Sequence, residues 1–335
     1  MKKIVIYRLG SIGDTVIALP CFKLIRSSYP DHQILILTNV PVSGKTVPLL
    51  SVLGDDQQLV DGFIEYPVGT RSLTLLWKLA RELRALKAET LIYLMPDRSA
   101  FSAWRDWLFF KLAGFAQVIG FPFKKDLRFN LIDEHSQTME REALRLLRGI
   151  NKLGHIDIDN ASAWDLCLSI SEREVGEAFV RALADKRYFS VNMGGKQIIN
   201  DWGYANWQAL FSSLKKNYQN YGLLAVGSQS DFDNAQCLLD EWPGKTVNAC
   251  GKLSPRESAA ALSKSTLFIG HDSGPLHLAS AMGVPTIGLF GNNNPPKKWH
   301  PYSKLSEVIH NMDGVLAISV TEVECKVESV LKAIS

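Results

Sequence analysis

The sequence predicts an α/β protein built from two doubly wound, Rossmann-like domains that face each other across a cleft. Short apolar runs rich in β-branched residues alternate with longer amphipathic segments, which is typical of βαβ units around a parallel sheet. The alternation occurs twice, and 335 residues suffice for two domains of about 150 residues each. A polar, irregular stretch over residues 151–171 separates the two series. We therefore predict a first domain over residues 1–160 and a second over residues 161–335.

The elements follow from hydrophobic periodicity. The first series predicts strands at Lys3–Tyr7, Ile34–Leu37, Phe63–Tyr66, Thr90–Met95 and Val118–Phe121, with helices at Thr15–Ser28, Leu73–Leu86, Ala100–Leu112 and Thr138–Leu153. The second predicts strands at Tyr188–Met193, Gly222–Val226, Thr266–Gly270 and Thr286–Phe290, with helices at Trp207–Lys216, Phe232–Leu239, Pro255–Lys264 and Pro275–Met282. A final helix, Thr321–Ile334, has apolar residues at helical spacing and is expected to pack as a cap or to cross back to the first domain.

Composition narrows the classes of function. The apolar share of 46% and the charged share of 21% are those of a globular protein, and a net charge of +3 does not favour nucleic acid as a partner. Five scattered cysteines, with no C-x-x-C pair, indicate neither a disulfide framework nor a zinc site. The sequence shows no secretion signal and no apolar run long enough to span a bilayer. We expect a cytoplasmic protein that needs no cofactor and no metal.

Basic residues are concentrated in the first domain. Between Arg71 and Arg148 there are fourteen Lys and Arg against nine Asp and Glu, so an anionic partner could dock there, although a solvated surface helix is the favoured explanation for any single basic residue. Within this stretch, Ser99–Phe115 contains Trp104, Trp107, Phe109 and Phe110 among its aromatic residues, with the basic Arg98, Arg105 and Lys111 in or beside it. Such a segment suits either a lipid or acceptor interface or a core helix, and the core helix is favoured.

The loop after the first strand carries the first candidate site. It reads R-L-G-S-I-G-D-T, where Gly10 and Gly13 allow a tight turn before a helix and Asp14 lies at the start of that helix. Asp14 could be a catalytic carboxylate or only a helix cap. The glycine spacing is not G-x-G-x-x-G, and no acidic residue follows the second strand, so NAD binding is disfavoured.

A second strand–glycine–helix junction lies in the second domain, at G-H-D-S-G-P-L-H-L-A over residues 270–279. Pro275 suits a first helical turn, whose free backbone N–H groups form an anion site. Ser273 can add a hydroxyl donor, and His277 can either reach the same anion or be a structural histidine. This combination predicts a site for a diphosphate.

These two segments carry a resemblance to a known family. R-L-G-S-I-G-D-T-V-I-A-L-P and H-D-S-G-P-L-H-L-A-S-A-M-G-V-P-T-I-G-L-F-G resemble the two hallmark segments of glycosyltransferase family 9, the heptosyltransferases of lipopolysaccharide core assembly. The resemblance implies a GT-B fold in which the first domain binds the acceptor and the second binds the nucleotide-sugar. It implies a metal-independent, inverting transfer, with ADP-heptose as donor and the lipopolysaccharide core or a related glycolipid as acceptor, at the cytoplasmic face of the inner membrane.

The resemblance also assigns roles to residues. It implies that Asp14 is the catalytic base. For the acceptor, we predict contacts with Gly13 and Arg98. The diphosphate-binding segment falls on Asp272, Ser273, Gly274 and His277, and the nucleoside contacts fall on Asp231 and Leu253.

One departure from the family pattern concerns the donor site. Where family members carry K-x-W-P, this chain reads Asn200-Asp201-Trp202-Gly203, so the phosphate-binding lysine is missing there. Lys196, which follows two glycines, is expected to replace it or to be a plain surface lysine. The strings Asp157-Ile158-Asp159 and Asp231-Phe232-Asp233 could suggest a metal site, but a linker and a helix cap explain them better.

Three alternatives to the heptosyltransferase hypothesis stay open at this stage. The same fold could use another nucleotide-hexose or another acceptor, as the change at Asn200 would allow. The chain could also be a catalytically silent nucleotide-binding protein, or, least favoured, a nicotinamide-dependent oxidoreductase.

Overall fold

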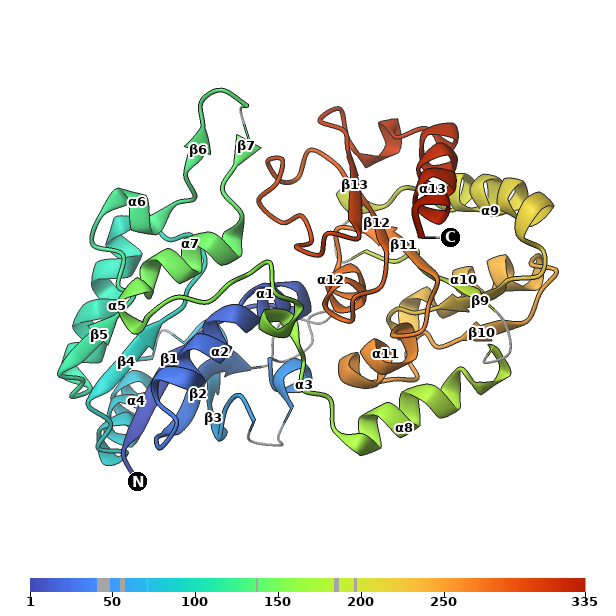
Figure 1. The fold of residues 1–335 in the computed structure, drawn as a ribbon. Helices are drawn as coiled ribbons and strands as arrows, with labels where there is room; N and C mark the ends of the chain where they lie inside the picture. The colour runs from blue at the N-terminus through green and yellow to red at the C-terminus, as the bar shows by residue number, and fades with distance from the viewer. Residues whose placement is uncertain are drawn as a thin grey trace. The chain divides into compact units, whose positions relative to one another are not determined.

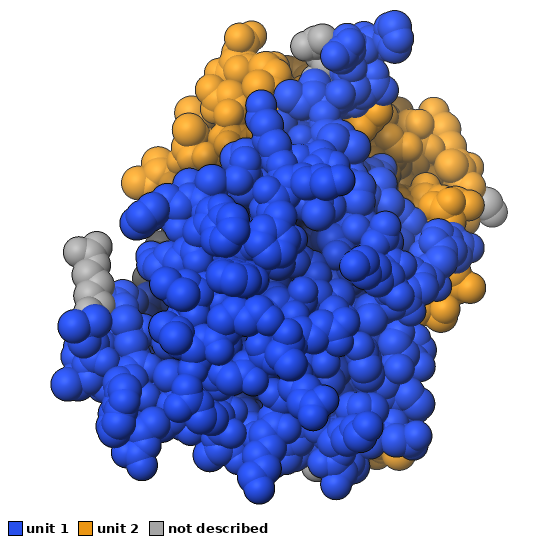
Figure 2. All heavy atoms as spheres, turned by 90° about the vertical axis from the view of Figure 1, so that its left-hand side faces the viewer, with its two compact units in different colours: residues 1–158 blue, residues 159–335 orange. Residues whose placement is uncertain are grey.

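A computed structural model describes residues 1–40, 49–54, 58–70, 72–136, 138–183, 187–195 and 198–334. The chain divides into two compact units, Met1–Ile158 and Asp159–Ser335, which Figure 2 colours separately. Each unit has its own parallel sheet with helices on it (Figure 1).

The five strands of unit 1 are parallel, in the order β3-β2-β1-β4-β5. Their core consists of nearly fully buried aliphatic and aromatic side chains, and the apolar runs that predicted the central strands β1, β2 and β4 are buried, whereas β3 and β5 are largely partly exposed. The strands are β1 (Lys3–Tyr7), β2 (Gln33–Val40), β3 (Gly62–Pro67), β4 (Thr90–Tyr93) and β5 (Gln117–Ile119), and the helices are α1 (Ile12–Ile17), α2 (Leu19–Ser28), α3 (Leu50–Leu53), α4 (Leu73–Ala85), α5 (Ala100–Leu112), α6 (Lys125–Arg128) and α7 (Glu142–Gly149).

Two predicted helices of unit 1 differ from the structure. The helix predicted over residues 15–28 begins earlier and is interrupted at Ala18, because Pro20 starts a new helix, α2. The helix predicted over residues 138–153 begins only at Glu142. The residues before it form β7 (Thr138–Met139), which pairs antiparallel with β6 (Ile132–Asp133).

Unit 2 contains a six-stranded parallel sheet in the order β10-β9-β8-β11-β12-β13. Its strands are β8 (Tyr188–Asn192), β9 (Gly222–Ala225), β10 (Thr246–Asn248), β11 (Leu267–His271), β12 (Thr286–Phe290) and β13 (Ser306–His310), and its helices are α8 (Ile170–Phe179), α9 (Tyr204–Tyr218), α10 (Phe232–Asp240), α11 (Pro255–Leu262), α12 (Gly274–Ala281) and α13 (Val320–Ile334). The four predicted strands are present, whereas β10, β13 and α8 were not predicted.

The final helix packs within unit 2. The buried side chains of α13 join the core under this sheet, and α13 contacts α9 and β13. Helix α8 packs against α11 at Gly176, where a Cβ atom would lie 2.5 Å from the Cβ of Ala260. The segment before β8 therefore belongs to the second unit as a structural helix.

Both strand orders reverse direction at one point, between β1 and β4 in unit 1 and between β8 and β11 in unit 2. Ligands of doubly wound folds bind at the carboxyl ends of the strands beside such a reversal. The loops that follow these four strands are therefore the first places to look for a site.

Candidate functional site

The loop after β1 brings Asp14 to the strand-order reversal of unit 1. Ser11 is the N-cap of α1 and Asp14 is the third residue of that helix, in a capping box. The backbone N–H and the hydroxyl of Ser11 both donate to Oδ2 of Asp14, each at 2.7 Å. Among the described residues, no hydrogen bond reaches Oδ1. One carboxylate oxygen thus fixes the side chain, and the other can take a proton.

Gly10 is required for this geometry. A Cβ atom at Gly10 would lie 2.5 Å from the Cβ of Asp14, so any side chain there would displace the carboxylate. Gly13 is buried in the first turn of α1, where backbone N–H groups have no acceptor within the helix. The two glycines therefore have different roles. Gly10 leaves room for the carboxylate of Asp14, and Gly13 brings its backbone close to Asp14.

Arg8 is a positioning residue that the sequence analysis did not single out. Its side chain is fully buried, and its guanidinium donates to the carbonyl of Leu94 at 2.8 Å and to that of Asp14 at 2.7 Å. It thereby joins the loop after β1 to the end of β4. Burial lowers the pKa of Arg8, while the nearby charges of Asp14 and Glu142 oppose that shift. The signal in the sequence was an arginine directly after a buried strand.

Arg98, the predicted acceptor contact, lies in the segment after β4. Its guanidinium is 3.2 Å from the carboxylate of Asp106, which is buried on α5. The hydroxyl of Tyr93 donates to the same carboxylate at 2.8 Å, and Arg105 pairs with it at 2.8 Å. Burial and the charge of Asp106 raise the pKa of Tyr93, so its phenol stays protonated. Arg98 is therefore held by a polar network, with 19% of its side chain exposed.

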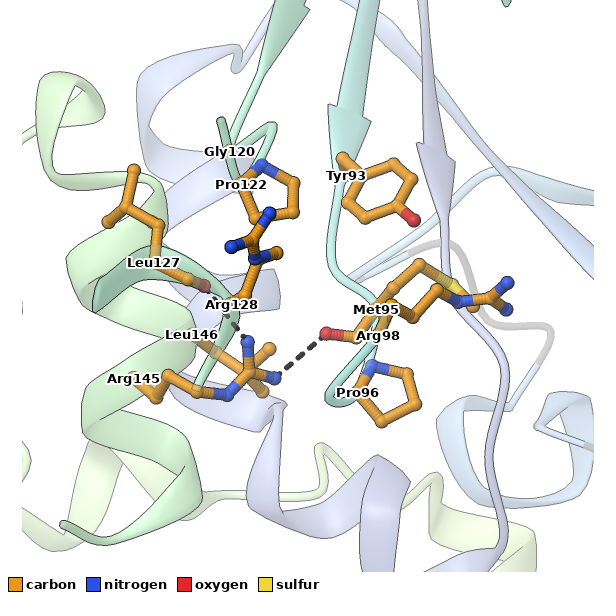
Figure 3. Close-up of a pocket in the computed structure, with 11 residues that line it drawn as sticks. Tyr93, Met95, Pro96, Arg98, Gly120, Pro122, Leu127, Arg128, Arg145 and Leu146 are labelled. Atoms are coloured by element: carbon orange, nitrogen blue, oxygen red, sulfur yellow. Dashed lines mark hydrogen bonds between the residues drawn. The ribbon is translucent and has the colours of Figure 1, made fainter. Parts of the chain in front are cut away.

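A pocket opens beside Arg98 at the ends of β4 and β5 (Figure 3). Figure 3 shows Arg145 under the pocket, with its guanidinium donating to the carbonyls of Met95 and Leu127 at 2.8 and 3.4 Å. The described residues that line it are Tyr93, Met95, Pro96, Arg98, Gly120, Pro122, Leu127, Arg128, Arg145, Leu146 and Gly149.

The charge of this pocket is positive. Arg145 is compensated by Glu142 and Asp97, and Arg98 by Asp106. Arg128, in contrast, forms no ion pair with a carboxylate in the part of the chain that the structure describes, and its guanidinium carbon lies 5.9 Å from the centre of the Phe129 ring. Its guanidinium leaves one unpaired positive charge in the pocket wall, which suits a single anionic group of a ligand.

In unit 2, Asn192 organises the reversal point, and it too was not predicted. Its side chain is 2% exposed at the end of β8, where Nδ2 donates to the carbonyl of Val226 at 3.0 Å. Its Oδ1 accepts a hydrogen bond from the Ser273 hydroxyl at 2.8 Å. Ser273 is the N-cap of α12 but makes no side-chain cap bond, because its hydroxyl is directed to Asn192. The backbone N–H groups at this helix start, including that of Gly274, can therefore face a ligand anion.

The two other predicted diphosphate contacts have different environments. Asp272 is partly buried and accepts a hydrogen bond from Nδ2 of Asn294 at 2.8 Å, which ties the loop after β12 to the end of β11. His277, in α12, is buried, with 4% of the residue exposed. This burial fits the structural alternative for His277, whereas Ser273 and Gly274 are partly exposed at the helix start.

The predicted nucleoside contacts lie at the ends of β9 and β10. Asp231 accepts two bonds of 2.7 Å from Ser228, the same arrangement as at Asp14, and its carboxylate lies against Gly194 and Gly227. A Cβ at Gly194 would be 2.2 Å from this carboxylate. The half-buried Leu253 follows β10 in a turn that is joined to Gly227 by a backbone bond.

The segment that departs from the family pattern is anchored in the core. Trp202 is fully buried, its backbone N–H donates to Nε2 of His271 at 3.0 Å, and its indole donates to the carbonyl of Ile318. Burial lowers the pKa of His271 to about 4, so the ring is neutral at pH 7 and accepts this bond. Asn200, in the same segment, is also buried. Lys196, the proposed replacement for the missing lysine, lies outside the described residues.

Comparison with known proteins identifies the family to which the chain is similar. The model of glycosyltransferase family 9 (heptosyltransferase) matches residues 76–324. The lipopolysaccharide core heptosyltransferase OpsX of Haemophilus influenzae is 22% identical over 312 residues, covering 92% of this chain and 84% of the relative.

Solved structures share the fold. A family 9 glycosyltransferase from Veillonella parvula aligns with a TM-score of 0.75 and 21% identity, covering 99% of this chain and 98% of its own. The Escherichia coli heptosyltransferase WaaC, solved with ADP, aligns with a TM-score of 0.67 and 15% identity, covering 98% and 99%. This likeness confirms the predicted GT-B class, with two Rossmann-like units.

Proposed function

Since the chain belongs to glycosyltransferase family 9, the heptosyltransferase family, we propose that it transfers heptose from ADP-heptose to a lipopolysaccharide core or related envelope glycolipid at the cytoplasmic face of the inner membrane. Support for the donor and the acceptor comes from the relatives. OpsX is named a lipopolysaccharide core heptosyltransferase, and WaaC was solved with ADP and with ADP-2-deoxy-2-fluoro heptose.

The observation that carries the proposed mechanism is the half-fixed carboxylate of Asp14. Glycosyl transfer needs a base that takes the proton of the acceptor hydroxyl while the bond from the anomeric carbon to the diphosphate breaks. We assign the base to Oδ1 of Asp14, since Ser11 occupies only Oδ2. Attack of the hydroxyl on the face opposite the diphosphate inverts the anomeric centre.

The departing ADP needs donors that stabilise its negative charge. We assign this role to the start of α12, where Ser273 and Gly274 present N–H groups and the helix dipole favours an anion. Asp231 and Leu253 are assigned to the nucleoside, and the partly buried Asp272 holds the adjoining loop through Asn294. Lys196 and His277 remain candidate phosphate contacts.

On the acceptor side, the arginine pocket supports an anionic glycolipid. Arg128 supplies the unpaired charge, and Arg98 borders the pocket from the segment after β4. Gly13 presents backbone to the acceptor beside Asp14. We expect a carboxylate or phosphate group of the acceptor to bind next to Arg128 while the reacting hydroxyl lies against Asp14.

The decisive experiment substitutes Asp14 by Asn. The Asn side-chain carbonyl can still accept both bonds from Ser11, so the capping box survives while the base is lost. We expect turnover to fall about 100-fold to 10,000-fold, with an unchanged dissociation constant for ADP in calorimetry and an unchanged melting temperature. Asp31→Asn, at an exposed position, is the matched control. Turnover near the wild-type value would reduce Asp14 to a helix cap and refute the mechanism.

One observation favours a second candidate within the same reaction class. The buried Asn200 occupies the place of the family's phosphate-binding lysine, so the donor could be a different nucleotide-hexose. Calorimetric titration with ADP, GDP and UDP separates the two candidate donors. Tighter binding of ADP supports ADP-heptose as the donor, and tighter binding of GDP or UDP supports a different nucleotide-hexose.

A further inference from the structure

Helix α5 exposes an apolar stripe that the core of unit 1 does not use. The stripe consists of Phe101, Trp104, Leu108 and Leu112, whose exposed fractions are 79%, 52%, 54% and 62%. Their spacing of three, four and four residues places them along one face of the helix. The opposite face packs inward through Ala103, Asp106 and Phe110. One face of α5 therefore belongs to the core, as the sequence predicts, whereas an apolar stripe along the whole length of the helix is exposed.

Neighbouring elements of unit 1 carry further exposed apolar side chains. Phe123, 52% exposed, lies with its ring 5.5 Å from that of Trp104. Helix α4, which contacts α5, exposes Leu73 and Trp77 at 82% and 62%. Figure 2 views unit 1 from the side on which α4, α5 and α6 lie in Figure 1.

The charge around this surface is strongly positive. Residues 73–87 and 100–125 together contain eight Lys and Arg and two acidic residues. One of the two, Asp106, is buried and paired with Arg105, so these two charges cancel and seven basic residues remain against Glu82. Arg81 lies over the ring of Trp77 at 4.6 Å, and Lys124 and Lys125 follow Phe123 in exposed positions.

We propose that the α5 stripe, with Phe123, Leu73 and Trp77, docks on a bilayer that contains anionic phospholipids. Aromatic and aliphatic side chains would enter the headgroup boundary while the basic side chains at the edge contact lipid phosphates. None of the described helices is long and apolar enough to cross a membrane, so the docking is peripheral. The inference deepens the proposed function, because a surface that holds the enzyme on the bilayer would bring unit 1 to a glycolipid acceptor.

The positive charge also decides between a bilayer and a second copy of the chain. Two identical surfaces of this kind would bring their lysines and arginines together, and like charges across an interface oppose association. An anionic bilayer complements the same charges, and each basic residue near its surface adds attraction.

The test is co-sedimentation of the full chain with vesicles, comparing phosphatidylglycerol-containing vesicles with phosphatidylcholine alone. The stripe variant is Phe101→Ser with Leu112→Ser, and the matched control is Ile170→Ser with Leu316→Ser, whose side chains are 78% and 68% exposed in unit 2. We expect the stripe variant to lose at least about tenfold in partitioning and the control variant to match the wild type. Lys124→Gln with Lys125→Gln should lose about fivefold per charge, on the anionic vesicles only.

Several outcomes would overturn the proposal. Wild-type protein that does not sediment with anionic vesicles, or a stripe variant that sediments as well as the control, removes the surface as a membrane site. Self-association that the stripe variant abolishes, seen by sedimentation velocity without vesicles, would assign the surface to a second copy.

A separate readout distinguishes this proposal from the proposed function. The stripe variant should keep wild-type turnover on a deacylated, water-soluble acceptor and lose it on acceptor embedded in vesicles. Wild-type protein that binds vesicles but transfers no sugar would refute the proposed function and leave the surface assignment standing.

Discussion

Replacing His271 by Gln tests how the buried end of β11 depends on a neutral histidine. The ring is fully buried, and Nε2 accepts the backbone N–H of Trp202. Burial is the main cause that lowers the pKa to about 4, while Asp201, the Gly194 backbone and Asp231 oppose it weakly. A glutamine can accept the same hydrogen bond through its carbonyl oxygen but does not titrate.

The sign of the pH effect follows from the two pKa values. In the unfolded chain His271 binds a proton near its ordinary pKa of 6.5, and in the folded protein only near pH 4. The contribution of this histidine is therefore fully present above about pH 6.5 and is lost as the pH falls toward 4. Each pKa unit corresponds to about 1.4 kcal/mol, so the loss between about pH 7 and pH 5 is about 2 kcal/mol, reaching about 3 kcal/mol near pH 4.

The assay is chemical unfolding at about pH 7 and about pH 5, followed by the fluorescence of the buried tryptophans of unit 2. The quantity of interest is the difference in unfolding free energy between wild type and His271→Gln, in which the other six histidines cancel. We expect this difference to shrink by about 2 kcal/mol on acidification. His135→Gln, at an exposed position, should leave the pH dependence unchanged. A difference between wild type and His271→Gln that is equal at both pH values would refute the reasoning.

Three further predictions concern two close contacts of glycines and the charge of Arg128. Gly194→Ala places a Cβ 2.2 Å from Asp231 and should weaken ADP binding about tenfold or more in calorimetry, because the carboxylate must move. Arg128→Gln should raise the acceptor KM about tenfold to 100-fold, because it removes the unpaired charge of the arginine pocket. Gly176→Ala brings two Cβ atoms within 2.5 Å at Ala260 and should lower the unfolding free energy by about 1–3 kcal/mol.

Matched variants separate each effect from general damage. Lys125→Gln removes an exposed charge near Arg128 and should leave the KM for a deacylated, water-soluble acceptor unchanged, and Arg128→Gln is measured with the same acceptor. Glu174→Ala on α8 should change stability by less than about 0.5 kcal/mol. Unaltered ADP affinity in Gly194→Ala would show that Asp231 does not contact the nucleoside. Equal KM values for Arg128→Gln and Lys125→Gln would remove the arginine pocket from the acceptor site, and wild-type stability of Gly176→Ala would contradict the tight α8–α11 contact.

Most of the fold could be predicted because the central strands of both sheets are continuous apolar runs. The elements that were missed carry a weaker signal. β10 has only three residues, and β13 is an edge strand whose side chains are mostly partly exposed, so neither has an apolar run. Helix α8 is polar and begins only at the end of the stretch that was interpreted as a linker, residues 151–171. Its packing against α11 depends on a glycine, which periodicity does not reveal.

The candidate site was predicted only where its residues are close in sequence. Glycine, aspartate and serine after a strand marked the loops at Asp14 and Ser273. Asn192 was missed because its partner Ser273 lies 81 residues away, and Arg8 because its contact with Leu94 spans 86 residues. Pairings of this kind follow from strand order, which a single sequence does not specify.

The same serine–aspartate arrangement holds the carboxylates of Asp14 and Asp231, and in each case the serine belongs to the same loop as the aspartate. Neither carboxylate depends on a distant part of the chain for these hydrogen bonds. Each loop should therefore keep its geometry when its unit is transplanted. Chimeras that join unit 1 of this chain to the second unit of another family member would test whether the second unit determines the donor sugar, as proposed, while Asp14 stays in its own loop.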